Sequence, residues 1–569
     1  MTISKEIGHN NNASAAIRKS AAVLSVILGV VYLFAFDSFG TPWKDELFQA
    51  LCVRDPKSAP EGLLTFCIGH AWCGIFGFSI ISLRMLASLF EFLSMSLCAV
   101  TMWRMTGNRL LSALSFLTGC VLLRTETFAI YNWDICSYLF DAMAMCLLVS
   151  CFRRPSVWKT AALGCAIALA TAARVPSVAM LPAAMLVTGI FYYKMNRGIR
   201  RALAAPALIL LSWTAAMLIL ASLMAGGPDA YVRLFTEGSV VSGHSFSDTN
   251  TLLYRFNWIA MRQPIYWFGS AGCVLIPLIL TRLRYRRGSD EGSGNPTRNR
   301  RIAIVIIVAW IAISALPLLN NQLYEYSNSN RLDFILGACV PIAVGLLLLL
   351  PARNLVSGGK SVSSDVSGQL WSIAAILICM CVGSDAYLQR MAVGFSLPLI
   401  IGVIWCASTP GIRRYLRVML IFTAAVYTSL LTAHYSHLIY KMHDKKYEQA
   451  GPLAGLHTES FIGNELEDGL PAVLEARHRG LKYFYAGNRD LMSLVAGPDN
   501  GPSHKNFGFD VYKYWEWDAP QVLKNIDAVV FYADPAKEPD NPFFRLFREE
   551  GFTRDEHVVG GVISSRPAK

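Results

Sequence analysis

Charged residues are scarce in this chain. They make up 16% of the 569 residues, whereas hydrophobic residues make up 54%, and the mean hydropathy is +0.40. So apolar a composition excludes an ordinary soluble domain, because at this length it requires repeated runs of roughly 20 apolar residues. The sequence therefore predicts a polytopic membrane protein.

The formal net charge of +12 does not indicate a nucleic-acid partner. The basic residues lie in short runs between apolar runs, and the tail from Lys441 onward holds more acidic than basic residues. The positive excess therefore belongs to the membrane part, where cytoplasmic loops are rich in Lys and Arg. We expect the lipid bilayer as a partner, and no nucleic acid.

Sequence signatures of metal and disulfide scaffolds are missing. No CxxC or HExxH spacing occurs, so nothing predicts a structural zinc. The fourteen cysteines lie between Cys52 and Cys406, most of them inside apolar runs, which is typical of small core residues. Cys52, Cys67 and Cys73 allow one disulfide in the first loop, but not a disulfide framework. No fixed-period repeat is evident, which argues against a solenoid or an inverted-repeat transporter.

A signal-peptide cleavage site is also missing after the first apolar run, 21–36. Arg18 and Lys19 precede this run, but no small-x-small site follows it. We predict an uncleaved first span that enters the membrane from the cytoplasm.

Hydropathy predicts about thirteen spans, an odd number that puts the two ends of the chain on opposite sides of the membrane. After 21–36, the predicted spans are 85–102, 110–123, 134–151, 160–173, 176–193, 202–225, 265–280, 302–319, 332–350, 370–382, 392–408 and 418–439.

The basic clusters support this order of spans, because all of them fall on the side that the order assigns to the cytoplasm. They are Arg104 with Arg109, Arg153 and Arg154 with Lys159, 194–201, 282–301, Arg353 with Lys360, and Arg413 and Arg414 with Arg417. The outer loops are then 37–84, 124–133, 226–264 and 320–331. We expect a multi-pass protein of the cytoplasmic (inner) membrane, with its N-terminus in the cytoplasm and its C-terminal domain periplasmic or extracellular.

The tail, 441–569, differs from the rest of the chain. Alternating runs at 481–486, 527–532 and 557–563 predict strands, and 519–525 and 542–550 predict helices between them. We expect a small outer α/β domain attached to a mainly α transmembrane bundle that comprises 1–440.

The first outer loop opens with an acidic pair. Asp45 and Glu46 directly follow the first span, just outside the membrane surface. Two adjacent carboxylates at this position call for a structural or functional explanation. The loop becomes apolar again at 63–81, but glycines and His70 interrupt it. We therefore predict one or two helices that lie along the membrane interface.

This layout resembles that of the GT-C glycosyltransferases, and among them the protein mannosyltransferase and aminoarabinose transferase group. The resemblance is carried by Asp45-Glu46, Glu61-Gly62-Leu63, Phe76-Gly77 through Ser82-Leu83-Arg84, Asp134, and Arg331 followed by Pro341. It implies transfer of a sugar from a polyprenyl-phosphate carrier to a lipid, glycan or protein acceptor at the outer leaflet, with inversion at the anomeric carbon. It leaves a divalent cation open, because some relatives use one and others none.

Such a transfer needs a base for the acceptor hydroxyl more than an acid for the leaving group, because a phosphate is already a weak base. Asp45 is the candidate base, and Glu46 the candidate that orients its partners or contacts the sugar. Alternatively, both are solvated acids at the membrane boundary. Asp134 either contacts the substrate or caps the helix that it begins. Asp141, deeper in that span, is a functional candidate unless the span starts later.

Outer-face cations are candidates for binding the donor phosphate. Arg84 and Arg331 are favoured because each adjoins an apolar run and an arginine fork matches phosphate oxygens, although snorkelling to lipid phosphate explains them equally well. The other outer cations are Arg54, Lys57, Arg174, Arg255 and Arg262.

Other polar groups of the outer loops suit a sugar or its acceptor. His70 could titrate near neutral pH or simply be a hydrogen-bonded loop residue. Tyr324 and Glu325 lie in a loop rich in amides and tyrosines, which is typical of sugar sites and also of polar loops without a ligand.

Other classes stay open. A secondary transporter would concentrate charged residues at mid-membrane, whereas here they collect in the outer loops. A polymerase or ligase of lipid-linked glycans usually has its large outer loop late in the chain, whereas the long outer loop comes first here. A purely structural assembly protein would show no effect of Asp45→Asn on any turnover.

Overall fold

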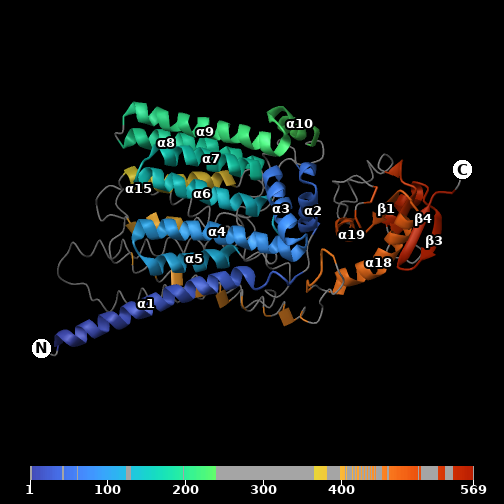
Figure 1. Cartoon of the computed structure of the whole chain (residues 1–569), viewed down its shortest axis with the longest axis horizontal. Helices are drawn as coiled ribbons and strands as arrows, with labels where there is room; N and C mark the ends of the chain where they lie inside the picture. The colour runs from blue at the N-terminus through green and yellow to red at the C-terminus, as the bar shows by residue number, and fades with distance from the viewer. Residues whose placement is uncertain are drawn as a thin grey trace.

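The protein consists of a helical bundle with a smaller domain at one end (Figure 1). The computed structural model describes residues 3–40, 44–59, 62–123, 130–195, 198–238, 364–380, 451–457, 460–487, 489–497, 499–500, 523–531 and 542–567, and shorter stretches between 398 and 443. Five helices in these ranges are long and apolar enough to cross a membrane. The prediction of a mainly α membrane bundle with a small C-terminal sheet domain is confirmed.

The bundle helices match the predicted apolar spans in order and place. They are α1 (Ile3–Phe34), α4 (Ile80–Thr106), α5 (Arg109–Leu123), α6 (Trp133–Arg153), α7 (Val157–Ala173), α8 (Met180–Lys194), α9 (Ile199–Ala225) and α15 (Ser364–Met380). The predicted spans 265–280, 302–319 and 332–350 lie outside the described residues, and 392–408 and 418–439 are described only in part.

Local signals set the helix ends a few residues away from the hydropathy boundaries. The Ser79 side chain caps α4 by accepting a hydrogen bond from the amide of Ser82, and α4 ends at Gly107 in the left-handed region. The Asn132 side chain caps α6 by accepting from the amide of Ile135. Arg84 therefore lies inside α4, whereas the sequence predicted that it closes the first outer loop.

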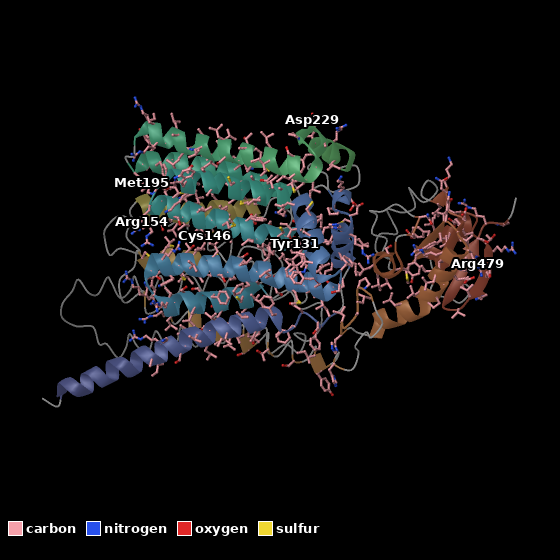
Figure 2. The ribbon with its side chains drawn as sticks, viewed as in Figure 1. Tyr131, Cys146, Arg154, Met195, Asp229 and Arg479 are labelled. Carbon is pink, nitrogen blue, oxygen red and sulfur yellow. The ribbon has the colours of Figure 1, made fainter. Side chains whose placement is uncertain are left out.

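The two ends of the bundle carry different loops. At one end, Arg153 Nη1 donates to the carbonyl of Arg104 at 2.8 Å, which joins two basic loops. Figure 2 shows Arg154 and Met195 at this basic end, and Tyr131 and Asp229 at the opposite end. The opposite end carries the loops predicted to be outer ones, and it is called the outer end below. The relative sidedness of the described loops therefore agrees with the charge pattern of the sequence.

The first outer loop forms three short helices at the outer end, α2 (Lys44–Arg54), η1 (Pro56–Ser58) and α3 (Leu63–Phe76). In Figure 1, α2 and α3 lie across the ends of the bundle helices, as expected for interfacial segments. Gly77, with φ +83°, ends α3 before α4 begins. Cys52, Cys67 and Cys73 are free thiols, so the described loop contains no disulfide between them.

The C-terminal domain packs helices around a four-stranded sheet of order β1-β2-β4-β3. Its elements are α18 (Ser460–His478), β1 (Tyr483–Ala486), α19 (Arg489–Ala496), β2 (Ala528–Phe531), α22 (Pro542–Glu549), β3 (Arg554–Val558) and β4 (Gly561–Ser565). β1 and β2 are parallel, and the other pairs are antiparallel. The predicted helix at 542–550 is confirmed, whereas most of 519–525 lies outside the described residues.

One strand prediction was wrong. The sequence predicted a single strand over 557–563, but the chain turns at Val559 and Gly560 and forms the β3–β4 hairpin. Gly560 has φ +82°, a conformation that glycine adopts without steric cost, so the chain reverses there. β3 becomes the exposed, charged edge of the sheet, and β4 is buried.

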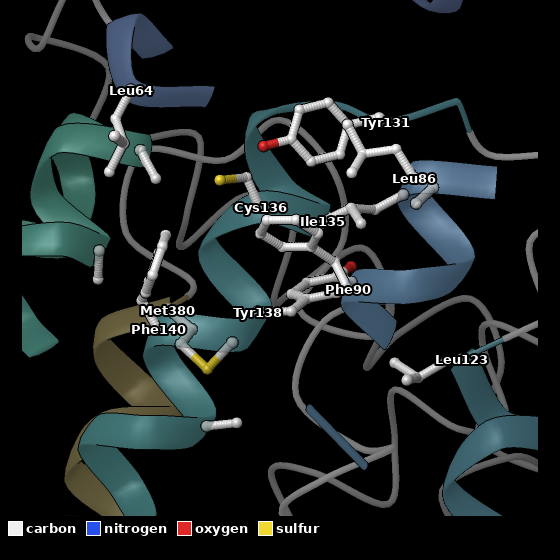
Figure 3. Close-up of a cluster of buried hydrophobic side chains, with 14 of the residues drawn as sticks. Leu64, Leu86, Phe90, Leu123, Tyr131, Ile135, Cys136, Tyr138, Phe140 and Met380 are labelled. Atoms are coloured by element: carbon white, nitrogen blue, oxygen red, sulfur yellow. The ribbon is translucent and has the colours of Figure 1, made fainter. Parts of the chain in front are cut away.

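The core of the bundle reaches the second outer loop. Figure 3 shows Phe90 of α4 beside Tyr131 and Cys136, and the rings of Phe90 and Tyr131 meet edge to face with centroids 5.2 Å apart. Tyr131 is fully buried. This packing fixes the start of α6 against α4, at the level where the candidate site lies.

Candidate active site

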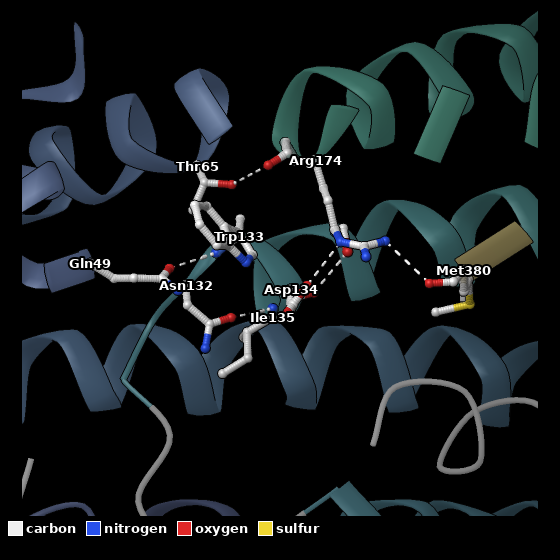
Figure 4. A network of polar contacts seen from close by, with 10 residues as sticks. Gln49, Thr65, Asn132, Trp133, Asp134, Ile135, Arg174 and Met380 are labelled. Carbon is white, nitrogen blue, oxygen red and sulfur yellow. Dashed lines mark hydrogen bonds and ion pairs between the residues drawn. The ribbon is translucent and has the colours of Figure 1, made fainter. Parts of the chain in front are cut away.

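The helix that carries the acidic pair is attached to the second outer loop. Glu46 Oε1 accepts a hydrogen bond from the amide of Ile130 at 3.3 Å, and Gln49 Oε1 accepts from the amide of Trp133 at 3.1 Å (Figure 4 shows the Gln49 contact). Glu46 and Gln49 are three residues apart and share one face of α2. α2 is thus held with that face against the start of α6.

Asp45 lies in the first turn of α2, and its side chain is outside the described part of the structure. The segment is helical, so Asp45 and Glu46 occupy positions about 100° apart around the axis. The Glu46 side chain is held by its contacts with the Ile130 amide and Arg84.

Arg84 connects the turn after α1 to α2. Its side chain is fully buried, with Nη1 donating to the carbonyl of Phe39 at 2.7 Å and Nη2 to that of Gly40 at 3.0 Å. Nη2 also lies 3.9 Å from Glu46 Oε2. The guanidinium is thus buried and binds groups of the chain itself.

Asp37 and Ser88 complete this connection. Ser88 Oγ lies within 3.0 Å of both carboxylate oxygens of Asp37 and 2.7 Å from the carbonyl of Leu33. Asp37 is 5% exposed. Asp37 follows the end of α1 and was not among the sequence candidates. The only feature that marked it in the sequence was its place directly after a long apolar run, where an acid often has a function.

A second acid and a second buried arginine meet at the start of α6. Asp134 Oδ1 lies 3.0 Å from Arg174 Nε, and Arg174 Nη1 donates to the carbonyl of Met380 at 3.2 Å (Figure 4). The side chain of Arg174 is 6% exposed and that of Asp134 is 21% exposed. The cap of α6 is the Asn132 side chain, so Asp134 does not have the capping role that the sequence allowed. Its carboxylate pairs with Arg174.

Arg174 was only one of several outer cations in the sequence. Its position shortly before Pro176 was the one feature that could have marked it. A proline disfavours helix just before it, which predicts that α7 ends near Arg174. α7 ends at Ala173, and Thr65 Oγ1 of α3 donates to the Ala173 carbonyl at 3.0 Å. Arg174 is therefore held where α3, α6 and α15 meet.

Two further cations of the first loop, Arg54 and Lys57, are exposed. The Arg54 guanidinium lies 4.3 Å from the centre of the Phe78 ring, and Lys57 is exposed in η1. Arg54 is nine residues from Asp45 in α2, which separates them by about 13 Å along the axis. Both groups can act on one sugar phosphate only if the donor lies along α2.

His70 of α3 is exposed, and its Nδ1 lies 3.0 Å from the carbonyl of Val53 in α2. This distance is consistent with the tautomer in which Nδ1 donates its proton. Burial raises the pKa of the neighbouring Cys73 thiol to about 11, although Arg54 opposes the shift. The thiol is therefore protonated at neutral pH and is a poor nucleophile.

Three predicted site residues, Arg331, Tyr324 and Glu325, lie outside the described residues. Among the residues that are described, no group of three or more His, Cys, Asp or Glu side chains could hold a metal ion. Glu46 and Asp134 each lie near an arginine, which competes with a cation for their oxygens.

No protein-family model matches the chain, and no curated protein matches it. Its fold is similar to that of an oligosaccharyltransferase from Archaeoglobus fulgidus, whose crystal structure contains zinc and sulfate. The TM-score is 0.45 and the identity 10%, over 90% of this chain and 67% of the archaeal one. The function proposed below therefore rests on the residues of this chain.

The chemistry available at the outer end is that of paired carboxylates and arginines beside an apolar bundle. Arg84 Nη2 lies 3.9 Å from Glu46 Oε2, and Arg174 Nε lies 3.0 Å from Asp134 Oδ1, so each of these acids has an arginine beside it. Burial raises the pKa of the Tyr131 phenol well above its usual value, so this group is neutral. Ionised acids at a fixed position can accept a proton or bind hydroxyl groups.

Proposed function

We propose that the protein is a glycosyltransferase that moves a sugar from a polyprenyl-phosphate donor to a lipid, glycan or protein acceptor at the outer face of the membrane. One observation carries this proposal: α2 is attached to the start of α6, which gathers the acids of two outer loops at one end of the bundle. An amphiphilic donor with its isoprenoid chain in the bilayer presents its phosphate and sugar at that level.

Asp45 is the proposed general base. The acceptor hydroxyl oxygen attacks the anomeric carbon of the sugar, and its proton passes to the Asp45 carboxylate. The bond between the anomeric carbon and the phosphate oxygen breaks, and polyprenyl phosphate leaves with the electron pair. A single displacement of this kind inverts the anomeric carbon, and the leaving phosphate needs no general acid.

The other candidate residues have binding roles in this proposal. Arg54, Lys57 and Arg331 neutralise the donor phosphate, since Arg84 and Arg174 are buried against groups of the chain itself. Asp134, His70, Tyr324 and Glu325 bind hydroxyl groups of the sugar or the acceptor.

The test is transfer of radiolabelled sugar from a synthetic polyprenyl-phosphate donor by the purified protein in nanodiscs. Asp45→Asn should reduce kcat by at least about 100-fold, because it removes the base. Asp55→Asn is the matched control, since Asp55 is an exposed acid of the same loop, and it should retain full activity. Equal activity of the two variants would remove Asp45 from the mechanism.

Two buried acids favour a secondary transporter as a second candidate. Glu91 of α4 is 2% exposed and Asp141 of α6 is 1% exposed, and Asp141 Oδ1 has no hydrogen-bond partner among the described residues. Glu91 lies about 16 Å along α4 from its outer start, a depth at which acids often bind ions or protons. Proton-coupled solute flux in proteoliposomes that is lost in Asp141→Asn would support this candidate over the first.

A further inference from the structure

The chain contacts the first outer loop a second time just before it enters the C-terminal domain. Residues 451–457, called the strap here, run beside the turn that follows α1. The Gly40 amide donates to the His457 carbonyl at 2.8 Å, and the His457 amide donates to the Ser38 carbonyl at 2.8 Å. The His457 ring stacks on Phe39, with ring centres 4.7 Å apart and planes 21° apart.

The strap is also fixed to the bundle. The amide of Ile80, the first residue of α4, donates to the Pro452 carbonyl at 2.9 Å. Leu453 and Leu456 are almost fully buried in the core cluster of the bundle. The strap is therefore a packed segment of the outer end rather than a free linker.

The strap and Arg84 contact the same turn. Arg84 donates to the carbonyls of Phe39 and Gly40, while His457 covers the Phe39 ring and accepts from the Gly40 amide. This turn leads within four residues to α2, and Arg84 also lies beside Glu46 of that helix. From the other side, α19 of the C-terminal domain packs against α2 (Figure 1).

We propose that His457 and Arg84 are positioning residues that fix α2, so that the C-terminal domain and the first outer loop form one rigid unit. The effect on catalysis rests on the proposed function, because α2 carries Asp45. The rigidity itself does not depend on any activity. Loss of either contact frees the turn at 37–40 and, with it, the start of α2.

Hydrogen exchange of the full-length protein in nanodiscs tests the rigidity. His457→Ala removes a stacked ring contact, and we expect exchange of the α2 amides, 44–54, to rise about twofold to tenfold. Arg84→Lys keeps the charge but loses the fork, and we expect a rise of about tenfold to 100-fold. Exchange of α9 should stay unchanged in both.

Matched variants separate positioning from general damage. His457→Phe keeps a ring on Phe39 but loses the contact of Nδ1 with the His443 carbonyl at 3.1 Å, so the exchange of α2 should return most of the way to the parent value. His478→Ala removes an exposed histidine of the same domain and should change nothing in α2. Unchanged exchange of α2 in both His457→Ala and Arg84→Lys would overturn the proposal.

Turnover gives the functional arm of the test. With the polyprenyl-phosphate donor, His457→Ala should lower kcat and leave the donor KM unchanged, and His457→Phe should rescue kcat. If Asp45→Asn leaves turnover intact while α2 responds as described, the glycosyltransferase mechanism fails and the positioning role stands.

Discussion

Removing the Arg174 guanidinium should strongly destabilise the outer end of the bundle. Arg174 is 5% exposed, and its Nε lies 3.0 Å from Asp134 Oδ1, with Nη1 on the carbonyl of Met380. Loss of one partner of a buried pair costs about 3–5 kcal/mol. Asp134 is partly exposed, so water recovers part of this cost, and we expect about 3 kcal/mol for Arg174→Met.

The double variant Arg174→Met with Asp134→Leu removes both charges and should recover most of the stability. Apolar residues often replace a buried ion pair without loss, so we expect a free energy of unfolding within about 1 kcal/mol of the parent value. The assay is equilibrium unfolding in mixed micelles of SDS and a non-ionic detergent, followed by circular dichroism and tryptophan fluorescence.

The exposed pair of Arg545 and Glu549 on α22 provides the control, and its removal should leave the unfolding curve unchanged. The pairing would be refuted if the effects of the Arg174 and Asp134 substitutions simply added, within about 0.5 kcal/mol.

Three further predictions concern packing, capping and pH. Gly164→Ala should destabilise the bundle by about 1–3 kcal/mol in the same assay, because the new methyl group would overlap the backbone oxygen of Ile209 in α9. Asn132→Ala should cost about 1 kcal/mol through loss of the α6 cap. Burial raises the pKa of Asp555, but hydrogen bonds from Arg548 and Ser564 outweigh it and hold the pKa below its usual value. This contribution to the stability of the domain is present above about pH 5 and is lost as the pH falls below about 4, which hydrogen exchange of 554–565 would measure.

Each of these predictions has a matched control. Gly189→Ala should be tolerated, since the nearest atom lies at 3.5 Å, and equal effects at 164 and 189 would contradict the close approach of α7 and α9. Ser156→Ala should cost nothing, because the Ser156 side chain makes no capping hydrogen bond. Asp555→Asn should remove the acid-dependent step, and its persistence would assign the step to another group.

The bundle could be predicted because its signal is local. Runs of apolar residues with basic residues at alternate ends specify helices and their order without reference to any partner. The caps Ser79 and Asn132 were also visible in the sequence and would have corrected two boundaries. Likewise, the glycine pair at 560 and 561 is a hairpin signal that the alternating pattern concealed.

The contacts that build the site could not be read in this way. Arg84 binds backbone carbonyls, and every residue has one, so no sequence pattern marks Phe39 or Gly40 as its partners. The stacking of His457 on Phe39 joins residues that are far apart in the chain. Arg174 and Asp134 come together only because α3, α6 and α15 meet at one point.

The central claim is that the donor phosphate binds at the end of the bundle where α2 meets α6. Cryo-electron microscopy of the protein in nanodiscs with a polyprenyl-phosphate donor tests it most directly. We predict density for the phosphate at this outer end, within about 4 Å of an outer-face arginine or lysine, and with the sugar toward α2. Phosphate density at the opposite end, beside Arg104 and Arg153, would contradict the account.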